Sequence, residues 1–315
     1  MHKPPLIVIA GPTASGKTNL SIALGRKLQG EVVAMDSMQI YRHMNIGTAK
    51  PSLEERNGIP HHMLDIADPN DAFSVADYAR QAKVCIDDIL QRGKIPILTG
   101  GTGLYLKALT SSMELGGTQA DPAIRERLTA ISQEENGVDT LCSMLLKIDP
   151  VTAQRLHRND IRRIIRALEV YELTGRPFSD QKQTDNVQCP YQLCILGMTV
   201  ERDLLYKRIE DRVDEMIRSG LPAEVERLLE MGVTADAQAM QGLGYKELVP
   251  VIRGEQSLSQ AIAAIKLGTR HYAKRQMTWF RRTEGIYWLD ALSHDLVSKA
   301  IQQVNDVLQL TQEDK

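Results

Sequence analysis

Short runs of apolar residues alternate with longer amphipathic stretches along most of this chain. Four runs, at residues 6–9, 31–36, 95–99 and 192–200, are continuous enough for strands that are buried on both faces. Apolar residues recur at helical spacing over residues 74–92, 204–219, 223–231 and 261–281. Strands that alternate with helices predict an α/β fold, in which a parallel sheet is flanked by helices.

The pattern changes near residue 113, after which helical periodicity continues to about residue 186 with no strand signal. We interpret residues 115–186 as an all-helical insertion domain, and residues 1–114 and 187–315 as the α/β core with its C-terminal helices. An apolar stripe of the insertion contains Ile164 and Ile165, and Arg162, Arg163 and Arg166 lie on the opposite face. Such a face is usually solvated. Because no acidic residue separates the arginines, we weigh a phosphate-binding face equally.

A glycine-rich loop follows the first strand and precedes a helix. Its residues fit the full phosphate-loop pattern G-x-x-x-x-G-K-T: Gly11, Pro12, Thr13, Ala14, Ser15, Gly16, Lys17 and Thr18. Backbone amides and the helix dipole favour an anion there, Lys17 adds a positive charge, and the Thr18 hydroxyl can ligate Mg²⁺. The sequence therefore predicts a P-loop NTPase-like sheet that binds a di- or triphosphate with Mg²⁺.

Two more strands end in residues with candidate chemistry. Asp36 ends the second strand, and a glycine turn with Thr102 at its centre follows the third. The carboxyl ends of parallel strands meet at one edge of the sheet, so both residues are expected beside the phosphate loop. Asp36 is a functional candidate by position, since a nucleotide hydrolase would use such a residue to hold Mg²⁺; its alternative role is a surface carboxylate or helix cap. The adjacent His61 and His62 are interpreted as loop or core residues and not as metal ligands.

The net charge of −2 alone suggests no polyanionic partner, but the distribution of charge along the chain suggests one. Residues 266–282 carry six basic and no acidic side chains, and residues 155–176 carry six basic and three acidic ones. Lys266, Arg270 and Lys274 follow one another at a spacing of four, where like charges repel. A bound polyanion would relieve that repulsion, so the pattern favours a nucleic-acid partner.

The cysteines and the absence of long apolar runs indicate the cellular compartment in which the protein is expected. The four cysteines form no C-x-x-C pair, so reduced thiols are expected and a zinc site is not. No run approaches 18 apolar residues and the first residues do not resemble a signal peptide, so no membrane partner is expected. We therefore expect a cytoplasmic monomer.

Six motifs occur in a fixed order from the first strand to about residue 288: GPTASGKT (11–18), DSMQIY (36–41), IGTAKP (46–51), GGTGLY (100–105), LGYKE (243–247) and KRQMTWFR (274–281). Together they resemble those of the bacterial tRNA dimethylallyltransferases. Each motif alone is weak, whereas the set is specific and spans nearly the whole chain.

This resemblance implies that the phosphate loop holds, with Mg²⁺, the diphosphate of dimethylallyl diphosphate. The acceptor would be the exocyclic amino group of the adenosine immediately 3′ of the anticodon in the tRNA anticodon stem-loop. The resemblance implies Asp36 as general base and Arg212 as a diphosphate contact, so that Asp36, Lys17, Thr18 and Arg212 form the catalytic set. Lys246 stands where some members have arginine, which weakens a bidentate contact there.

The residues that the resemblance implies for tRNA binding come from both parts of the chain. They are Asp36, Ser37, Met38, Gln39, Thr102, Arg125, Arg162, Arg163, Ile164, Ile165, Arg166, Gln241, Gly242, Leu243, Gly244, Tyr245, Lys246, Lys274, Arg275, Gln276 and Arg281.

Three alternatives fit part of the sequence. A P-loop kinase of nucleosides or metabolites would explain the first hundred residues but not the basic segments. An isopentenyltransferase that acts on free adenosine phosphates would not need a tRNA-sized basic surface. A nucleotide-switched RNA-binding protein would form no covalent product.

Overall fold

The computed structural model describes residues 3–111, 121–180 and 189–309. The chain forms two compact units, one of residues 1–110 and 189–315 and one of residues 111–188. Among the described residues, no helix is both long and apolar enough to cross a bilayer.

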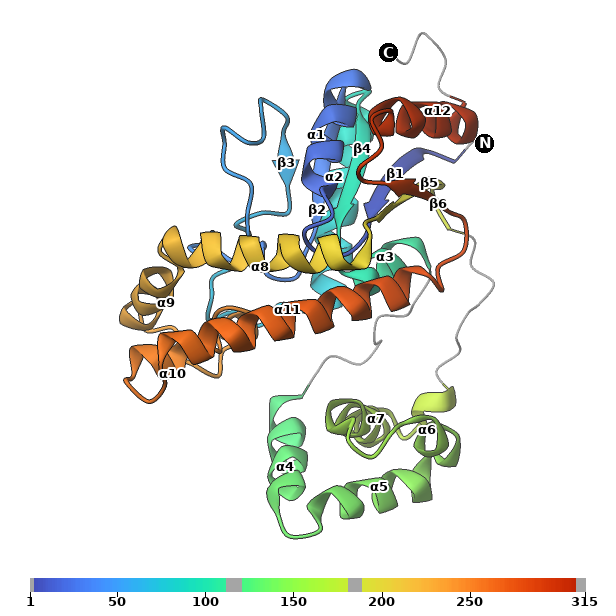
Figure 1. Cartoon of the computed structure of the whole chain (residues 1–315). Coiled ribbons are helices and arrows are strands. Elements are labelled where there is room, and N and C mark those ends of the chain that lie inside the picture. The colour runs from blue at the N-terminus through green and yellow to red at the C-terminus, as the bar shows by residue number, and fades with distance from the viewer. Residues whose placement is uncertain (1–2, 112–120, 181–188, 310–315) are drawn as a thin grey trace. The chain divides into compact units, whose positions relative to one another are not determined.

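The larger unit contains a six-stranded sheet in which every neighbouring pair of strands is parallel. From edge to edge its order is β3 (His61–His62), β2 (Gly30–Met35), β4 (Ile95–Gly100), β1 (Pro5–Ala10), β5 (Gln192–Thr199) and β6 (Ile286–Asp290) (Figure 1). The predicted α/β class is confirmed. The sequence analysis predicted the four central strands and missed the two edge strands.

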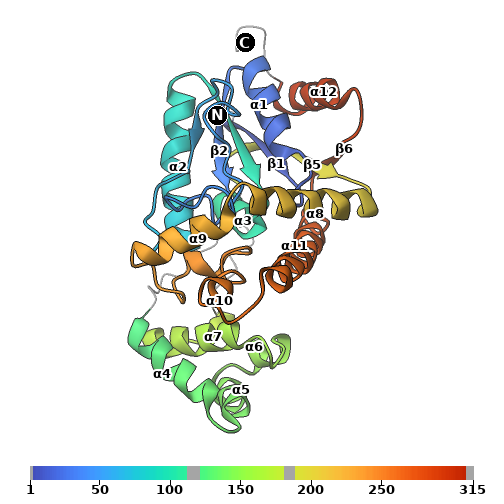
Figure 2. The same cartoon turned by 60° about the vertical axis from the view of Figure 1, so that its left-hand side comes forward.

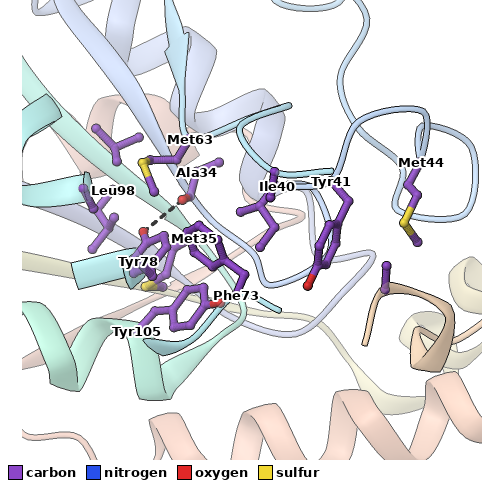
Figure 3. Close-up of a cluster of buried hydrophobic side chains, with 14 of the residues drawn as sticks. Ala34, Met35, Ile40, Tyr41, Met44, Met63, Phe73, Tyr78, Leu98 and Tyr105 are labelled. Atoms are coloured by element: carbon purple, nitrogen blue, oxygen red, sulfur yellow. Dashed lines mark hydrogen bonds between the residues drawn. The ribbon is translucent and has the colours of Figure 1, made fainter. Parts of the chain in front are cut away.

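Helices cover both faces of the sheet. Leu6 and Val8 of β1 face a cluster with α2 (Val75–Gln91) and α3 (Gly103–Thr110), whereas Ile7 and Ile9 face α1 (Lys17–Lys27) and α12 (Leu296–Leu308). Alternate side chains of a strand point to opposite faces, so a continuous apolar run is what a doubly covered strand requires. In Figure 3, Tyr78 of α2 lies against the sheet, where its hydroxyl donates to the Ala34 carbonyl at 2.9 Å.

The remaining helices of this unit lie beyond the carboxyl ends of the strands (Figure 2). They are α8 (Arg202–Arg218), α9 (Leu221–Glu230), the short η2 (Ala239–Gln241), α10 (Val249–Ile252) and α11 (Leu258–Phe280). The predicted helix start at residue 223 is wrong by two residues, because Gly220 takes a left-handed conformation and Pro222 fits the first turn of α9. Ser74 and Asp77 form a capping box at the start of α2.

The smaller unit is helical where the structure describes it. Its elements are α4 (Pro122–Gln133), α5 (Gly137–Ile148), α6 (Pro150–Arg155), α7 (Ile161–Thr174) and the short η1 (Phe178–Asp180). The apolar stripe of α7 lies in a core with Leu128 of α4 and Leu141 of α5. Glu169 is fully buried there and pairs with Arg125 and Arg166.

Candidate active site

The loop between β1 and α1 is shaped to surround an anion. Gly16 precedes α1 with a φ of 88°, and no side chain caps the first turn of this helix. The amides at the start of α1 therefore have no partner within the helix and attract negative charge. Lys17 folds back along the loop, and its Nζ donates to the Pro12 carbonyl at 2.6 Å. This is the geometry of a phosphate-binding loop.

A glutamine from a distant helix holds this loop in place. The side chain of Gln276 on α11 accepts a hydrogen bond from the backbone N–H of Thr13 at 2.9 Å and donates one to the Gly101 carbonyl at 3.0 Å. These partners follow β1 and β4, which are adjacent strands. A Cβ atom at Gly101 would collide with the glutamine amide, so only glycine permits this approach. Gln276 thereby joins the phosphate loop to the neighbouring strand end.

Asp36 follows β2, which lies on the far side of β4 from the phosphate loop. Its Oδ1 accepts hydrogen bonds from the backbone N–H groups of Met38, at 2.8 Å, and Gln39, at 3.2 Å. Its Oδ2 accepts none from the part of the chain that the structure describes. One oxygen therefore orients the carboxylate, and the other can accept a proton.

Two adjoining cavities share a wall at Asp36. The first, of about 230 Å³, contains the phosphate loop from Thr13 to Thr18. The second, of about 300 Å³, lies among α8, α11 and the loop after η2. Thr13, Asp36, Thr48, Arg212 and Tyr272 line both cavities. A molecule held on the phosphate loop and another in the second cavity would therefore meet at these residues.

Charged groups at this junction influence one another. Burial and the nearby Arg212 lower the pKa of Lys17 to about 7, although the Asp36 carboxylate opposes the shift. Burial also lowers the pKa of Arg212, again against the effect of Asp36. Burial and the charge of Asp36 raise the pKa of Tyr272 to about 12. Two poorly solvated cations that repel each other favour an anionic ligand, because its charge would stabilise both.

A buried carboxylate shapes the loop that borders both cavities. Glu224 of α9 is only 2% exposed, and it accepts hydrogen bonds from the backbone N–H groups of Asn45, Ile46 and Gly47 and from the Tyr245 hydroxyl. A Cβ atom at Gly47 would lie 2.5 Å from the Tyr245 ring, so this residue must be glycine. Residues 47 and 48 line the second cavity and residues 48 and 49 line the first, so Glu224 helps to shape both.

The chain has close relatives among known proteins. Residues 39–283 match the model of the IPP transferase family. The chain is 48% identical over 287 residues to the tRNA dimethylallyltransferase of Pelotomaculum thermopropionicum, covering 91% of both chains. It is 50% identical over 287 residues to that of Carboxydothermus hydrogenoformans, covering 91% of this chain and 92% of the relative. The chain belongs to the IPP transferase family.

Solved structures agree with this assignment. The full-length tRNA isopentenylpyrophosphate transferase of Bacillus halodurans is similar with a TM-score of 0.72 and 43% identity, over 99% of this chain and 98% of that one. A eukaryotic dimethylallyltransferase described as acting on tRNA is similar with a TM-score of 0.82 and 33% identity, over 97% of this chain and 80% of that one. The resemblance predicted from the sequence motifs is confirmed.

The structure of this IPP transferase family member brings many of the predicted site residues together. Residues 13–18 of the phosphate loop, Gln39 and Gln276 line the first cavity. The second cavity is lined by Ser37, Met38, Gln241, Gly242, Leu243, Gly244, Lys246 and Arg275. Lys274 and Arg281 line a separate cavity of about 280 Å³. Thr102 lies at the start of α3, and its Oγ1 is buried without a hydrogen bond in the described part of the chain.

Four of the residues that are expected to contact tRNA have buried side chains. Ile164 and Ile165 are buried in the core of the helical unit. Tyr245 is buried against Glu224, and the buried amide of Gln276 is used by the phosphate loop and Gly101. These side chains support neighbouring structure because their polar or apolar groups already have partners inside the protein.

The expectation that a polyanion relieves the charge repulsion on α11 is wrong for two residues. Lys266 pairs with Asp214, and Arg270 pairs with Glu210, both of α8. Two of the α7 arginines are paired as well, since Arg163 contacts Asp160 and Arg166 contacts Glu169. The net charge of these two segments therefore overstated how many of their cations lack an ion-pair partner within the chain.

Three contributors to the site were missed or misread in the sequence. Tyr272 was not among the predicted site residues, yet it lines both cavities. Glu224 carried no local signal. His61, read as a loop or core residue, belongs to β3 and lines the first cavity with an Nε2 atom that is buried without a partner in the described chain.

Proposed function

We propose that this protein transfers a dimethylallyl group from dimethylallyl diphosphate to the exocyclic amino group of the adenosine 3′ of the anticodon in tRNA. One observation carries the proposal: the phosphate loop and Asp36 lie in one cavity, at its junction with a second. A kinase would place its acceptor hydroxyl near the γ-phosphate of ATP. Here the loop holds the leaving group, and the relatives named above support tRNA as the acceptor.

The geometry supports a direct displacement. The amino nitrogen of the adenosine attacks the first carbon of the dimethylallyl group, the carbon–oxygen bond breaks, and its electron pair leaves with the diphosphate. The proton of the nitrogen passes to Oδ2 of Asp36, since Oδ1 is occupied by two backbone N–H groups. Lys17, Arg212 and the amides at the start of α1 stabilise the charge that develops on the diphosphate.

Magnesium fits this site as a partner of the substrate. Among the described residues, no group of three or more His, Cys, Asp or Glu side chains is arranged to hold a metal. The first cavity instead offers the hydroxyl of Thr18 beside the phosphate loop. Mg²⁺ commonly takes one or two protein ligands and completes its shell with phosphate oxygens and water. Bound there, it would supply positive charge to the leaving group.

The proposal is tested with labelled dimethylallyl diphosphate and Mg²⁺ in the presence of tRNA, AMP or ATP. We expect label in tRNA only. Label on AMP would support a free-nucleotide transferase, and consumption of ATP without label transfer would support a kinase. Tight RNA binding without any covalent product would support an RNA-binding protein.

The variant Asp36→Asn isolates the proton-accepting role. Its amide oxygen can still accept from the N–H groups of Met38 and Gln39, so the loop should keep its shape. We expect transfer to fall by about 10²–10⁴-fold, the range typical of general acid–base catalysis, while tRNA binding persists. Unchanged turnover in this variant would remove Asp36 from the mechanism.

A further inference from the structure

A third cavity lies beside the two that form the candidate active site. It has a volume of about 450 Å³ and lies between α3 and the C-terminal end of α11. Its lining combines an indole ring, three cationic side chains and three hydroxyl groups, from Trp279, Lys107, Arg275, Arg282, Thr110, Thr278 and Thr283. Aromatic, cationic and hydroxyl groups in one cavity are the chemistry of a nucleotide subsite.

This cavity is continuous with the candidate active site through one side chain. Arg275 lines both the third cavity and the cavity that ends at Asp36. Its guanidinium lies 5.8 Å from the centre of the Tyr272 ring, which borders the junction of the two catalytic cavities. Tyr272, Arg275 and Trp279 follow at spacings of three and four residues, so they form one stripe along α11, and Arg282 lies in the turn that follows the helix. Aromatic and arginine side chains thus alternate away from the reaction centre.

The indole of Trp279 is held in place and yet accessible. A Cβ atom at Gly103 would collide with its Cδ1 and Nε1 atoms, so the ring edge rests directly on the backbone at the start of α3. The residue is nevertheless 38% exposed and lines the cavity. Neither Arg275 nor Arg282 forms an ion pair with any described residue. A rigid ring beside two unpaired guanidinium groups can bind a base and its phosphates without reorganisation.

We propose that this third cavity is a stacking subsite for a second base of the tRNA, one that directly flanks the modified adenosine. The proposal rests on the proposed function, since the adenosine must occupy the cavity at Asp36. Seven residues of helix separate Tyr272 from Trp279, a rise of about 10 Å, so one strand can span both positions. The flanking base stacks on Trp279, while Arg275 and Arg282 hold its phosphates. Stacking accepts any base, so this subsite fixes the strand more than it reads the sequence.

The two tryptophans of the chain provide a direct test. In the variant Trp288→Phe, Trp279 is the sole indole, and an anticodon stem-loop RNA should quench its fluorescence on binding. The matched variant Trp279→Phe leaves only Trp288, which lies on β6 and packs against Gly197; its fluorescence should change little. Stem-loops with an abasic nucleotide on either side of the adenosine then identify the stacked base, because one of them should abolish the quenching.

Kinetics separate a binding role from a structural one. Loss of a base–aromatic stack, as in Trp279→Leu, should raise KM for the stem-loop by about 5- to 100-fold. The KM for dimethylallyl diphosphate and the thermal midpoint should remain near those of the wild type, and Trp279→Phe should restore most of the loss.

Failure of the proposed subsite can be distinguished from failure of the proposed function. If the wild-type protein transfers dimethylallyl to the stem-loop but binding leaves Trp279 fluorescence unchanged, or Trp279→Leu leaves KM unchanged, the subsite is refuted and the proposed function stands. Equal quenching by both abasic stem-loops and the intact one would also refute it. If no tRNA or stem-loop accepts the label, the proposed function itself fails.

Discussion

The carboxylate of Glu224 offers a sharp test of how the site is built. Its Oε2 accepts from the N–H groups of Asn45 and Ile46, and its Oε1 accepts from the N–H groups of Ile46 and Gly47 and from the Tyr245 hydroxyl. The variant Glu224→Gln replaces one of these oxygens with an amide NH₂ of nearly the same size. Whichever oxygen is replaced, at least one partly buried backbone N–H loses its acceptor and faces another donor.

The magnitude follows from this geometry. A buried donor left without an acceptor costs about 1–3 kcal/mol, and hydrogen bonds to a charged group are stronger than neutral ones. We therefore expect Glu224→Gln to lose about 2–3 kcal/mol of stability, which lowers the thermal midpoint by about 3–5 °C in a protein of this size. The loop from Asn45 to Lys50 should loosen as well, because its backbone loses an anchor.

A matched control lies two residues further along the same helix. Glu226 is exposed on α9, so Glu226→Gln should change stability by no more than about 0.5 kcal/mol. Thermal and urea unfolding of both variants, with transfer rates measured well below the midpoints, separate a stability effect from a catalytic one. We expect Glu224→Gln alone to lower kcat/KM. Equal stability of the two variants would refute the role assigned to this buried carboxylate.

Two further predictions concern charge. Replacement of Lys274 and Arg281 by alanine should reduce the slope of log K against log salt for tRNA binding by about 1–2. The control Lys266→Ala removes a cation that is already paired with Asp214, so it should change the slope less. Equal slopes in the double variant and the control would mean that Lys274 and Arg281 do not contact phosphates. Arg92 hydrogen bonds lower the pKa of Glu31, which is 6% exposed, from 4.5 to about 2, so its stabilisation is complete above pH 4.5 and decreases as pH falls toward 2. The wild type should therefore lose about 2 kcal/mol more of its free energy of unfolding between pH 7 and pH 3 than the variant Glu31→Gln, as measured by urea unfolding at each pH. The same pH dependence in both proteins would contradict this.

Local signals in the sequence were sufficient for the framework of the site. The phosphate loop lies between a buried strand and a helix, and Asp36 follows a second buried strand, so their meeting at one sheet edge follows from parallel topology. Neither edge strand was predicted. His61 and His62 form a strand of two residues, too short for any periodicity, and the short apolar run of β6, Ile286–Leu289, was not recognised as a strand.

Long-range pairings could not be predicted in the same way. Gln276 meets the phosphate loop across 263 residues, and Glu224 meets its loop across nearly 180. Neither residue differs in its local sequence from a solvent-exposed helical side chain. Their roles arise because α9 and α11 fold over the carboxyl ends of the strands, which is a property of the tertiary structure.

The charge pattern of α11 shows how structure narrows a sequence prediction. A run of six cations without an acid predicted one basic surface. In the structure, the acidic side chains of α8 already pair with Lys266 and Arg270, the two cations nearest the start of the helix. The four cations from Lys274 onward form no ion pair with any described residue, and Arg275 borders the catalytic cavity. Within this segment, the cations without an ion pair to a described residue therefore lie at the end of α11 that carries Trp279 and in the turn after it, beside the proposed stacking subsite.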